Sequence, residues 1–238
     1  MGLGPLLLHD LLDLKRQGAI PQQPSVVEIG AQQLSNALLR DTDAIRACFA
    51  AFGRPVPDFP TPGARVDVDG IEVQPANAPA ADMLWQGLGF TYACVDYGGH
   101  RNSIPIDLNS DSVPSDLRGR FDLVVNSGTT EHVANQANAF KVMHDLAAPA
   151  GGVNYHELPA GAVDHGLISY TPNFFTLLQR QNDYEQLICR PRTETDMTIR
   201  VAFRRRDGRD FNTPLDIRSK RFRLKHKPAM LALRRLFS

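Results

Sequence analysis

The chain is short of the residues that mark secreted and membrane proteins. It has only three cysteines, Cys48, Cys94 and Cys189, and no C-x-x-C pair. An odd number of widely spaced cysteines argues against a disulfide framework and predicts buried thiols in a reducing compartment. No apolar run is long enough to span a membrane, and no basic segment precedes the short run Leu6–Leu8, so neither a signal peptide nor a transmembrane segment is expected. These absences predict a soluble, cytoplasmic protein.

The chain also lacks net charge, because 26 Lys and Arg balance 26 Asp and Glu. No overall field therefore steers it toward polyanions. The charge is unevenly distributed: from Arg200 to the end, 13 Lys and Arg stand against three Asp. We expect one domain over residues 1–210, with an element inserted at about 53–80, and a basic C-terminal tail over 211–238.

The tail alternates basic residues with Phe222 and Leu224. Two interpretations stay open: a solvated terminus, or a peripheral contact with anionic lipid, a polyanionic acceptor or nucleic acid. A lipid contact would place the cytoplasmic protein at the membrane surface. No base-reading motif accompanies the tail, so sequence-specific binding of nucleic acid is not expected.

The pattern of apolar residues predicts alternating strands and helices. Strands are expected at 25–30, 90–96, 104–107, 121–126, 153–158, 187–189 and 197–203, and helices at 5–17, 36–52, 80–88, 130–146 and 171–181. A hairpin is expected around 65–73, within the inserted element. Strands that alternate with helices form βαβ units, which predicts an α/β domain with a mostly parallel sheet.

Acidic residues stand near the ends of three predicted strands. Glu28 precedes Gly30, Asp96 ends the second strand, and Asp107 ends the third. Doubly wound sheets bind their ligands beyond the carboxyl ends of the strands. A carboxylate there accepts two hydrogen bonds from ribose hydroxyls or binds an amine.

These segments, taken in order, resemble those of class I S-adenosylmethionine-dependent methyltransferases over about residues 20–205. The segments are Val26–Gly30, Cys94–Asp96, Pro105–Asp107, Arg120–Val133 with its Glu-His pair, and the turn Leu146–Gly152. The resemblance implies a Rossmann-like three-layer sandwich, whose seven-stranded, mostly parallel sheet has an antiparallel last strand. It also implies an enzyme that uses S-adenosyl-L-methionine.

The same resemblance implies where the cofactor binds. Glu28 would lie near its methionine amino end, and Asp96 would bind its ribose. The full set of implied cofactor-binding residues is Glu28, Gly30, Gln32, Asp96, Asp107, Leu108, Asn126 and Ser127.

The first motif departs from the family pattern E-x-G-x-G-x-G. Only Gly30 survives, while Gln32 and Leu34 stand at the second and third glycine positions. The side chain of Gln32 either crowds the cofactor or hydrogen-bonds to it. The lost glycines favour an alternative, a non-catalytic methyltransferase-like binding or scaffold module. A nicotinamide-dependent enzyme is disfavoured, because the chain lacks G-x-G-x-x-G after the first strand.

Methyl transfer to an oxygen or nitrogen requires a group that takes the acceptor's proton. Histidine titrates near neutrality, and we expect His132 to be this base, followed by His165 and then His156. A small-molecule or glycan-like acceptor is expected. No metal site is expected, because the histidine spacing is not a known ligand pattern and Gly128 replaces the first Glu of the E-x-x-E-H pattern of some relatives.

Overall fold

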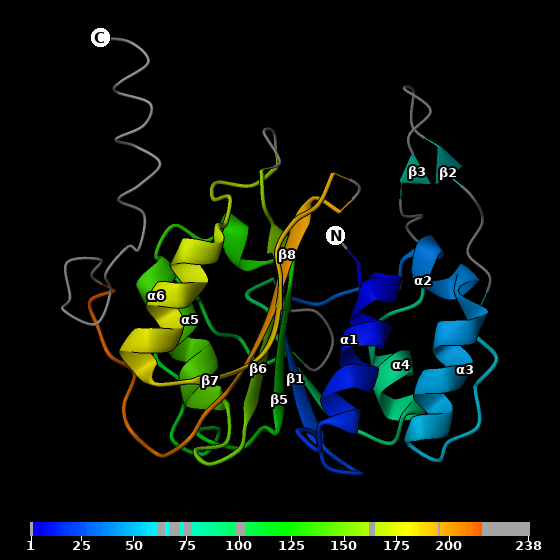
Figure 1. Ribbon diagram of the computed structural model, residues 1–238, viewed down its shortest axis with the longest axis horizontal. Coiled ribbons are helices and arrows are strands. Elements are labelled where there is room, and N and C mark those ends of the chain that lie inside the picture. The colour runs from blue at the N-terminus through cyan, green and yellow to red at the C-terminus, as the bar shows by residue number, and fades with distance from the viewer. Residues whose placement is uncertain are drawn as a thin grey trace, which may run out of the picture.

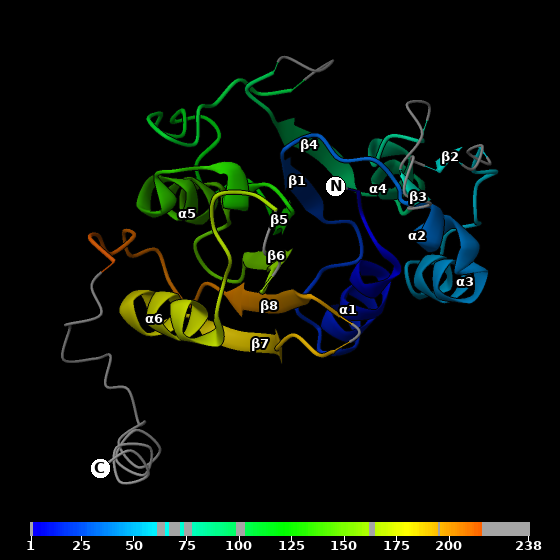
Figure 2. The same ribbon diagram turned by 90° about the horizontal axis from the view of Figure 1, so that it is seen from above.

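The fold is an α/β sandwich of three layers in the computed structural model (Figure 1). Of the 238 residues, the structure describes 2–60, 65–66, 72–73, 78–98, 103–161, 165–194 and 196–215, with only the backbone described at 65–66 and 72–73. A single sheet forms the middle layer. Seen from above, α1 to α4 cover one face and α5 and α6 cover the other (Figure 2).

The main sheet has six strands in the order β4-β1-β5-β6-β8-β7. Their bounds are β1 Ser25–Ile29, β4 Thr91–Val95, β5 Leu123–Ser127, β6 Val153–Pro159, β7 Glu185–Arg190 and β8 Thr198–Arg204. The pairs of β1 with β4, β1 with β5, and β5 with β6 are parallel. β8 runs antiparallel to both of its neighbours, which confirms the expected antiparallel last strand.

The prediction of seven strands is wrong by one within the described residues. The predicted strand at 104–107 makes a single isolated bridge, between Ile104 and Val95. Its chain then turns, because Asp107 accepts a hydrogen bond from the backbone of Asn109 and donates its own backbone N–H to Asp111. Local side-chain bonds of this kind compete with the ladder of a sheet.

The helices are α1 Pro5–Arg16, α2 Asn36–Arg40, α3 Thr42–Ala51, α4 Asp82–Gly87, α5 Gln136–Leu146 and α6 Pro172–Asn182. Two predicted helices are each divided. Asp41 separates α2 from α3, because its carboxylate accepts a hydrogen bond from the backbone of Ala44 and caps a new helix. Asn135 likewise caps α5, so that the 3-10 turn η1, Thr130–His132, stands apart from it.

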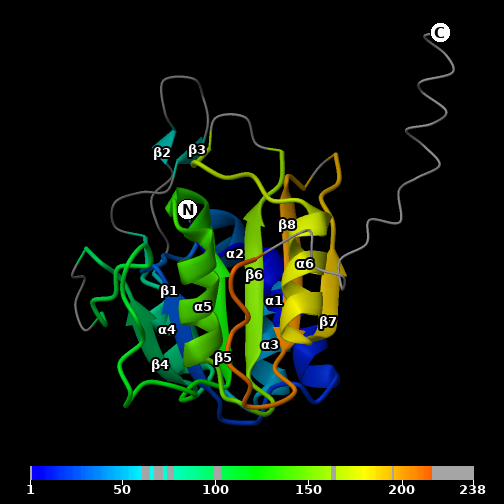
Figure 3. The same cartoon turned by 90° about the vertical axis from the view of Figure 1, so that its left-hand side faces the viewer.

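Alternating side chains of the sheet feed two cores. Val26 belongs to the core beneath α1, α3 and α4. Val27 and Ile29 belong to the core beneath α5 and α6, the two helices that lie in front of the sheet in Figure 3. This alternation is the two-residue period of a strand, and it decides to which face of the sheet each side chain of β1 points.

The remaining predictions concern the insertion, the cysteines and membrane spans. β2 (Arg65–Val66) pairs antiparallel with β3 (Glu72–Val73), as the hairpin pattern predicts, although its turn lies outside the described residues. Cys189 is exposed, contrary to the expectation of a buried thiol, because it lies on the edge strand β7. Every helix within the described ranges is too short or too polar to cross a membrane. Residues 216–238 of the predicted basic tail lie outside those ranges.

Candidate functional site at the carboxyl ends of the strands

A cavity of about 510 Å³ lies at the carboxyl ends of β1, β4 and β5. β1 stands between β4 and β5, so the order of strands reverses there, and such a switch point is where doubly wound sheets bind ligands. The volume falls in the range of roughly 300–1,000 Å³ that is usual for small-molecule sites. The lining residues are Gly30, Ala31, Gln32, Val95, Asp96, Tyr97, Ile106, Asp107, Leu108, Asn109, Gly128, Thr129, His132 and Val133.

The turn after β1 is locked to the turn after β5. Thr129 donates a hydrogen bond from Oγ1 to the carbonyl of Ile29, at 2.6 Å. Gly30 has a φ of +80°, and a Cβ placed on it would lie 2.5 Å from Oγ1 of Thr129. Only glycine combines this backbone conformation with so close an approach. The surviving glycine of the motif is therefore required by the fold of the cavity itself.

Gln32 also lines the cavity, next to Thr129. Its Nε2 donates a hydrogen bond to Oγ1 of Thr129 at 3.2 Å, and the residue is only 8% exposed. Its Oε1 is buried and has no hydrogen-bond partner. A buried acceptor without a donor is costly, so this oxygen is suited to receive a donor from a ligand.

The third glycine position is not part of the cavity. Leu34 is fully buried and pairs with Leu3 in an isolated parallel bridge, while Gln33 pairs with Ala80. The chain after Gly30 thus leads into the core and reaches α2 only at Asn36. Leucine is the better residue where the chain packs into a core, which explains why a glycine is not needed at 34.

Asp96 stands at the end of β4 and faces the cavity. Its Oδ2 accepts a hydrogen bond from the backbone N–H of Ala31 at 2.9 Å, and its Oδ1 accepts one from Gly98 at 2.7 Å. Each carboxylate oxygen has two lone pairs, so each keeps one for a hydroxyl donor. The two backbone bonds hold the carboxylate in place at the cavity.

One wall of the cavity is apolar and the rim beside it is polar. The wall consists of the buried side chains of Val95, Ile106, Leu108 and Val133. Asp107 lies next to this wall, and the hydrogen bond from the backbone of Asn109 holds the pKa of its carboxyl below the usual value. The carboxylate is therefore ionised at neutral pH. Both Asp107 and Leu108 line the cavity.

Glu28 does not line the cavity. It shares the face of β1 with Val26, and its carboxylate accepts hydrogen bonds from Nε1 of Trp85 at 2.7 Å and from the hydroxyl of Tyr92 at 2.9 Å. Burial raises the pKa of Glu28 to about 7, and these hydrogen bonds oppose the rise. Its surroundings are those of a structural residue that holds α4 and β4 to β1.

Asn126 and Ser127 are also buried, at the end of β5, and neither lines the cavity. Nδ2 of Asn126 donates a hydrogen bond to Oγ1 of Thr130 at 2.9 Å. Thr130 also accepts a hydrogen bond from the hydroxyl of Tyr170. These contacts fix the start of η1, the turn that carries His132.

The three histidines that the sequence suggests for catalysis lie in different surroundings. His132 lines the cavity, and 54% of its side chain is exposed. His156 is 1% exposed and packs between aromatic rings of the α5 and α6 core, where burial lowers its pKa to about 3. His165 approaches His132 from a different loop, with 5.2 Å between their ring centroids.

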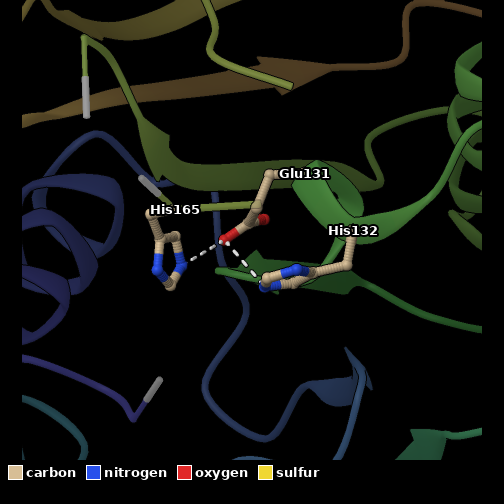
Figure 4. Close-up of side chains that lie close together, drawn as sticks. All are labelled: Glu131, His132 and His165. Carbon is tan, nitrogen blue, oxygen red and sulfur yellow. Dashed lines mark ion pairs between the residues drawn. The ribbon is translucent and has the colours of Figure 1, made fainter. Parts of the chain in front are cut away.

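Glu131 lies between His132 and His165 (Figure 4). Its Oε1 is 3.8 Å from Nε2 of His132 and 3.4 Å from Nε2 of His165. The side chain of Glu131 is completely buried. The structure thus joins two of the three candidate histidines through a carboxylate next to the cavity-lining His132.

Sequence reasoning missed several residues that shape the site. Thr129 is the main one, since it bonds to Ile29 and covers Gly30. Asn109 ties two loops together by accepting hydrogen bonds from the backbones of Ala134 and Asn135. The sequence shows only that both residues follow strand ends, and nothing in their types marks them as part of a cavity.

No model of a known protein family matches the chain, and no curated protein matches it. The chain does resemble solved structures. The trans-methyltransferase CalH in complex with SAH is 14% identical, with a TM-score of 0.45, and the match covers 82% of this chain and 54% of CalH. The chain therefore spans about half the length of CalH.

Two further solved structures match most of their own length. An S-adenosylmethionine-dependent methyltransferase from Mesorhizobium loti is 12% identical, with a TM-score of 0.38 and coverage of 83% of this chain and 100% of that one. A Rhodobacter sphaeroides protein that carries the name Zn-dependent alcohol dehydrogenase is 13% identical, with a TM-score of 0.42 and coverage of 83% and 90%. Because these identities and TM-scores are low, the fold is assigned from the strand order of this chain.

Proposed function

We propose that the protein transfers a methyl group from S-adenosylmethionine to an oxygen or nitrogen of a small-molecule or glycan-like acceptor. The observation that carries the proposal is the cavity at the switch point of the sheet. It combines the close backbone approach at Gly30, the carboxylate of Asp96 and an apolar wall at Ile106, Leu108 and Val133. A nucleoside with a charged amino acid attached needs these three features together.

The residues at the cavity fit the parts of the cofactor one by one. The carboxylate of Asp96 has a free lone pair on each oxygen for two ribose hydroxyls. The orphaned Oε1 of Gln32 suits the ammonium group of the methionine end. The apolar wall with Leu108 suits the adenine ring. Gln32 stands at the second glycine position of the motif, and in this proposal its side chain binds the cofactor.

S-adenosylmethionine, when bound, supplies a methyl group that is already activated on a positively charged sulfur. The protein has to align the acceptor, exclude water and accept a proton. Of the candidate histidines, only His132 lines the cavity, so we assign this proton to its imidazole. His165 lies on the far side of Glu131 from His132. His156 is not assigned a role, because it is buried in the core beneath α5 and α6.

Isothermal titration with S-adenosylhomocysteine, the stable product, tests the proposal. We expect binding in the micromolar range and a loss of about 10- to 100-fold in Asp96→Ala, because hydrogen bonds to a charged group contribute about 1.5–3 kcal/mol. Asp116→Ala is the matched control, since that carboxylate is exposed and outside the cavity lining. Both variants are compared by thermal unfolding to verify that they fold.

A well-folded protein that binds neither S-adenosylhomocysteine nor S-adenosylmethionine would contradict the proposal. The remaining candidate would then be a non-catalytic module with a methyltransferase-like fold. If the cofactor binds, acceptors can be screened by following the formation of S-adenosylhomocysteine. Loss of turnover in His132→Ala with unchanged cofactor binding would support the role of His132.

A further inference from the structure

Glu131, His132 and His165, here called the Glu131 cluster, bring three ligand atoms together at the edge of the cavity. One carboxylate oxygen and two imidazole nitrogens all lie within 4.8 Å of one another. Figure 4 shows both rings turned toward the carboxylate from opposite sides. Glu131 and His132 come from η1, whereas His165 comes from the loop that precedes α6. Distant parts of the sequence thus converge on one point.

The loop that carries His165 is fastened to Glu131. The backbone N–H groups of Leu167 and Ile168 donate hydrogen bonds to the carbonyl of Glu131, at 2.7 and 3.1 Å. Gly166 has a φ of +73°, and a Cβ placed on it would lie 2.7 Å from Cγ of Glu131. His165 is therefore held beside the carboxylate by backbone contacts, independently of its own side chain.

Three polar atoms of the Glu131 cluster have no hydrogen-bond partner. Neither Oε1 nor Oε2 of Glu131 has a hydrogen-bond partner, although the side chain is fully buried. Nε2 of His165 is also buried and without a hydrogen-bond partner, even though 41% of that side chain is exposed. Proteins seldom bury a carboxylate without hydrogen-bond donors, because removing its charge from water is costly. A cation among the three side chains would remove that cost.

We propose that the Glu131 cluster binds a divalent transition-metal ion such as zinc. Zinc takes one carboxylate and two histidines at about 2.0–2.2 Å, and tetrahedral ligands at that distance lie about 3.4 Å apart. Oε1 of Glu131 and Nε2 of His165 already have this separation, 3.4 Å, and His132 is at 3.8 Å. The side chain of His132 is half exposed, so its ring is less confined than Glu131 and can approach the other two ligand atoms.

Because His132 also lines the cavity, an ion held by the Glu131 cluster would lie beside the place where the proposed acceptor binds. This role rests on the proposed function, whereas binding of the metal does not. With an ion bound, His132 would hold the metal in place of taking the proton itself. The ion would supply Lewis-acid chemistry, because it would lower the pKa of an acceptor hydroxyl, whose proton would pass to solvent water. The oxygen would then form its bond to the methyl carbon as the carbon–sulfur bond breaks.

Titration of untagged, chelator-treated protein with ZnCl₂ tests the site, and the absorption spectrum of the Co²⁺-loaded protein reports the ligand geometry. We expect one ion per chain in the wild type. We expect the affinity for zinc to fall at least about tenfold in His132→Ala and in His165→Ala. Loss of a residue that only hydrogen-bonds to a metal ligand already lowers metal affinity by about that factor. Glu131→Gln keeps the shape of the buried side chain and should lose the site as well.

His9→Ala is the matched control, because His9 is an exposed histidine 3.5 Å from the carboxylate of Asp41 without a second histidine described beside it. This variant should bind zinc like the wild type. Zinc binding that is absent in the wild type, or equal in all variants, would overturn the proposal and leave only an ion pair. Titration with S-adenosylhomocysteine, done in parallel, separates failure of the metal site from failure of the cofactor site.

Discussion

Replacement of Gly30 by alanine should destabilise the fold. A Cβ at Gly30 would lie 2.5 Å from Oγ1 and 3.0 Å from Cγ2 of Thr129, in a residue with a φ of +80°. The left-handed backbone costs about 1–2 kcal/mol for a residue with a Cβ. Overpacking against Thr129 adds about 1–3 kcal/mol. We therefore expect Gly30→Ala to lower the free energy of unfolding by about 2–5 kcal/mol.

Gly18→Ala isolates the backbone cost. Gly18 has a φ of +66°, but no atom lies within 4 Å of the place where its Cβ would be. Gly18→Ala should therefore lower the free energy of unfolding by only about 1–2 kcal/mol. Urea unfolding of the two variants measures the difference. Adding Thr129→Ala to Gly30→Ala removes the clashing atoms and should return about 1–2 kcal/mol as a coupling energy. Equal costs for Gly30→Ala and Gly18→Ala would refute the close approach of Thr129.

Three further perturbations test buried groups. Burial raises the pKa of Glu28 from an ordinary 4.5 to about 7, so the protein should lose up to about 3 kcal/mol of stability as pH rises from about 4.5 to 7. Urea unfolding at several pH values measures this slope, and Glu28→Gln should abolish it. The imidazole of His156, whose pKa burial lowers to about 3, should stay neutral in NMR titrations below the ordinary value of 6.5, and a ring that titrates near 6.5 would contradict its burial. Asp10 is buried between Arg190 and Arg200, so Asp10→Ala should cost about 3–5 kcal/mol in urea unfolding, and a cost under about 1 kcal/mol would show that the pair is solvated.

The architecture could be predicted from the sequence because apolar runs and helical spacing are local signals. The strands on either side of the cavity occur where the pattern places them, and Asp96 does stand at the end of β4. The errors are also local in origin. Asp41 and Asn135 cap new helices inside segments whose apolar spacing is continuous. The spacing of apolar residues does not reveal such caps.

The site was harder to predict than the fold, because its contacts join distant segments. Glu28 matches the first motif, yet the period of β1 turns it toward Trp85 and away from the cavity. His165 is far from His132 in sequence, and only the folded chain shows that Glu131 lies between them. A motif gives the position of a residue along a strand, whereas the direction of its side chain depends on the packing of the neighbouring layer.

Mapping of S-adenosylhomocysteine onto the backbone amides by NMR tests the central claim most directly. We expect saturable shifts that cluster at residues 30–32, 95–97, 106–109, 128–129 and 132–133, which line the cavity at the ends of β1, β4 and β5. Amides in the core around His156 should move little. Shifts that are absent, or that gather on another face of the sheet, would contradict the assignment of this cavity as the cofactor site.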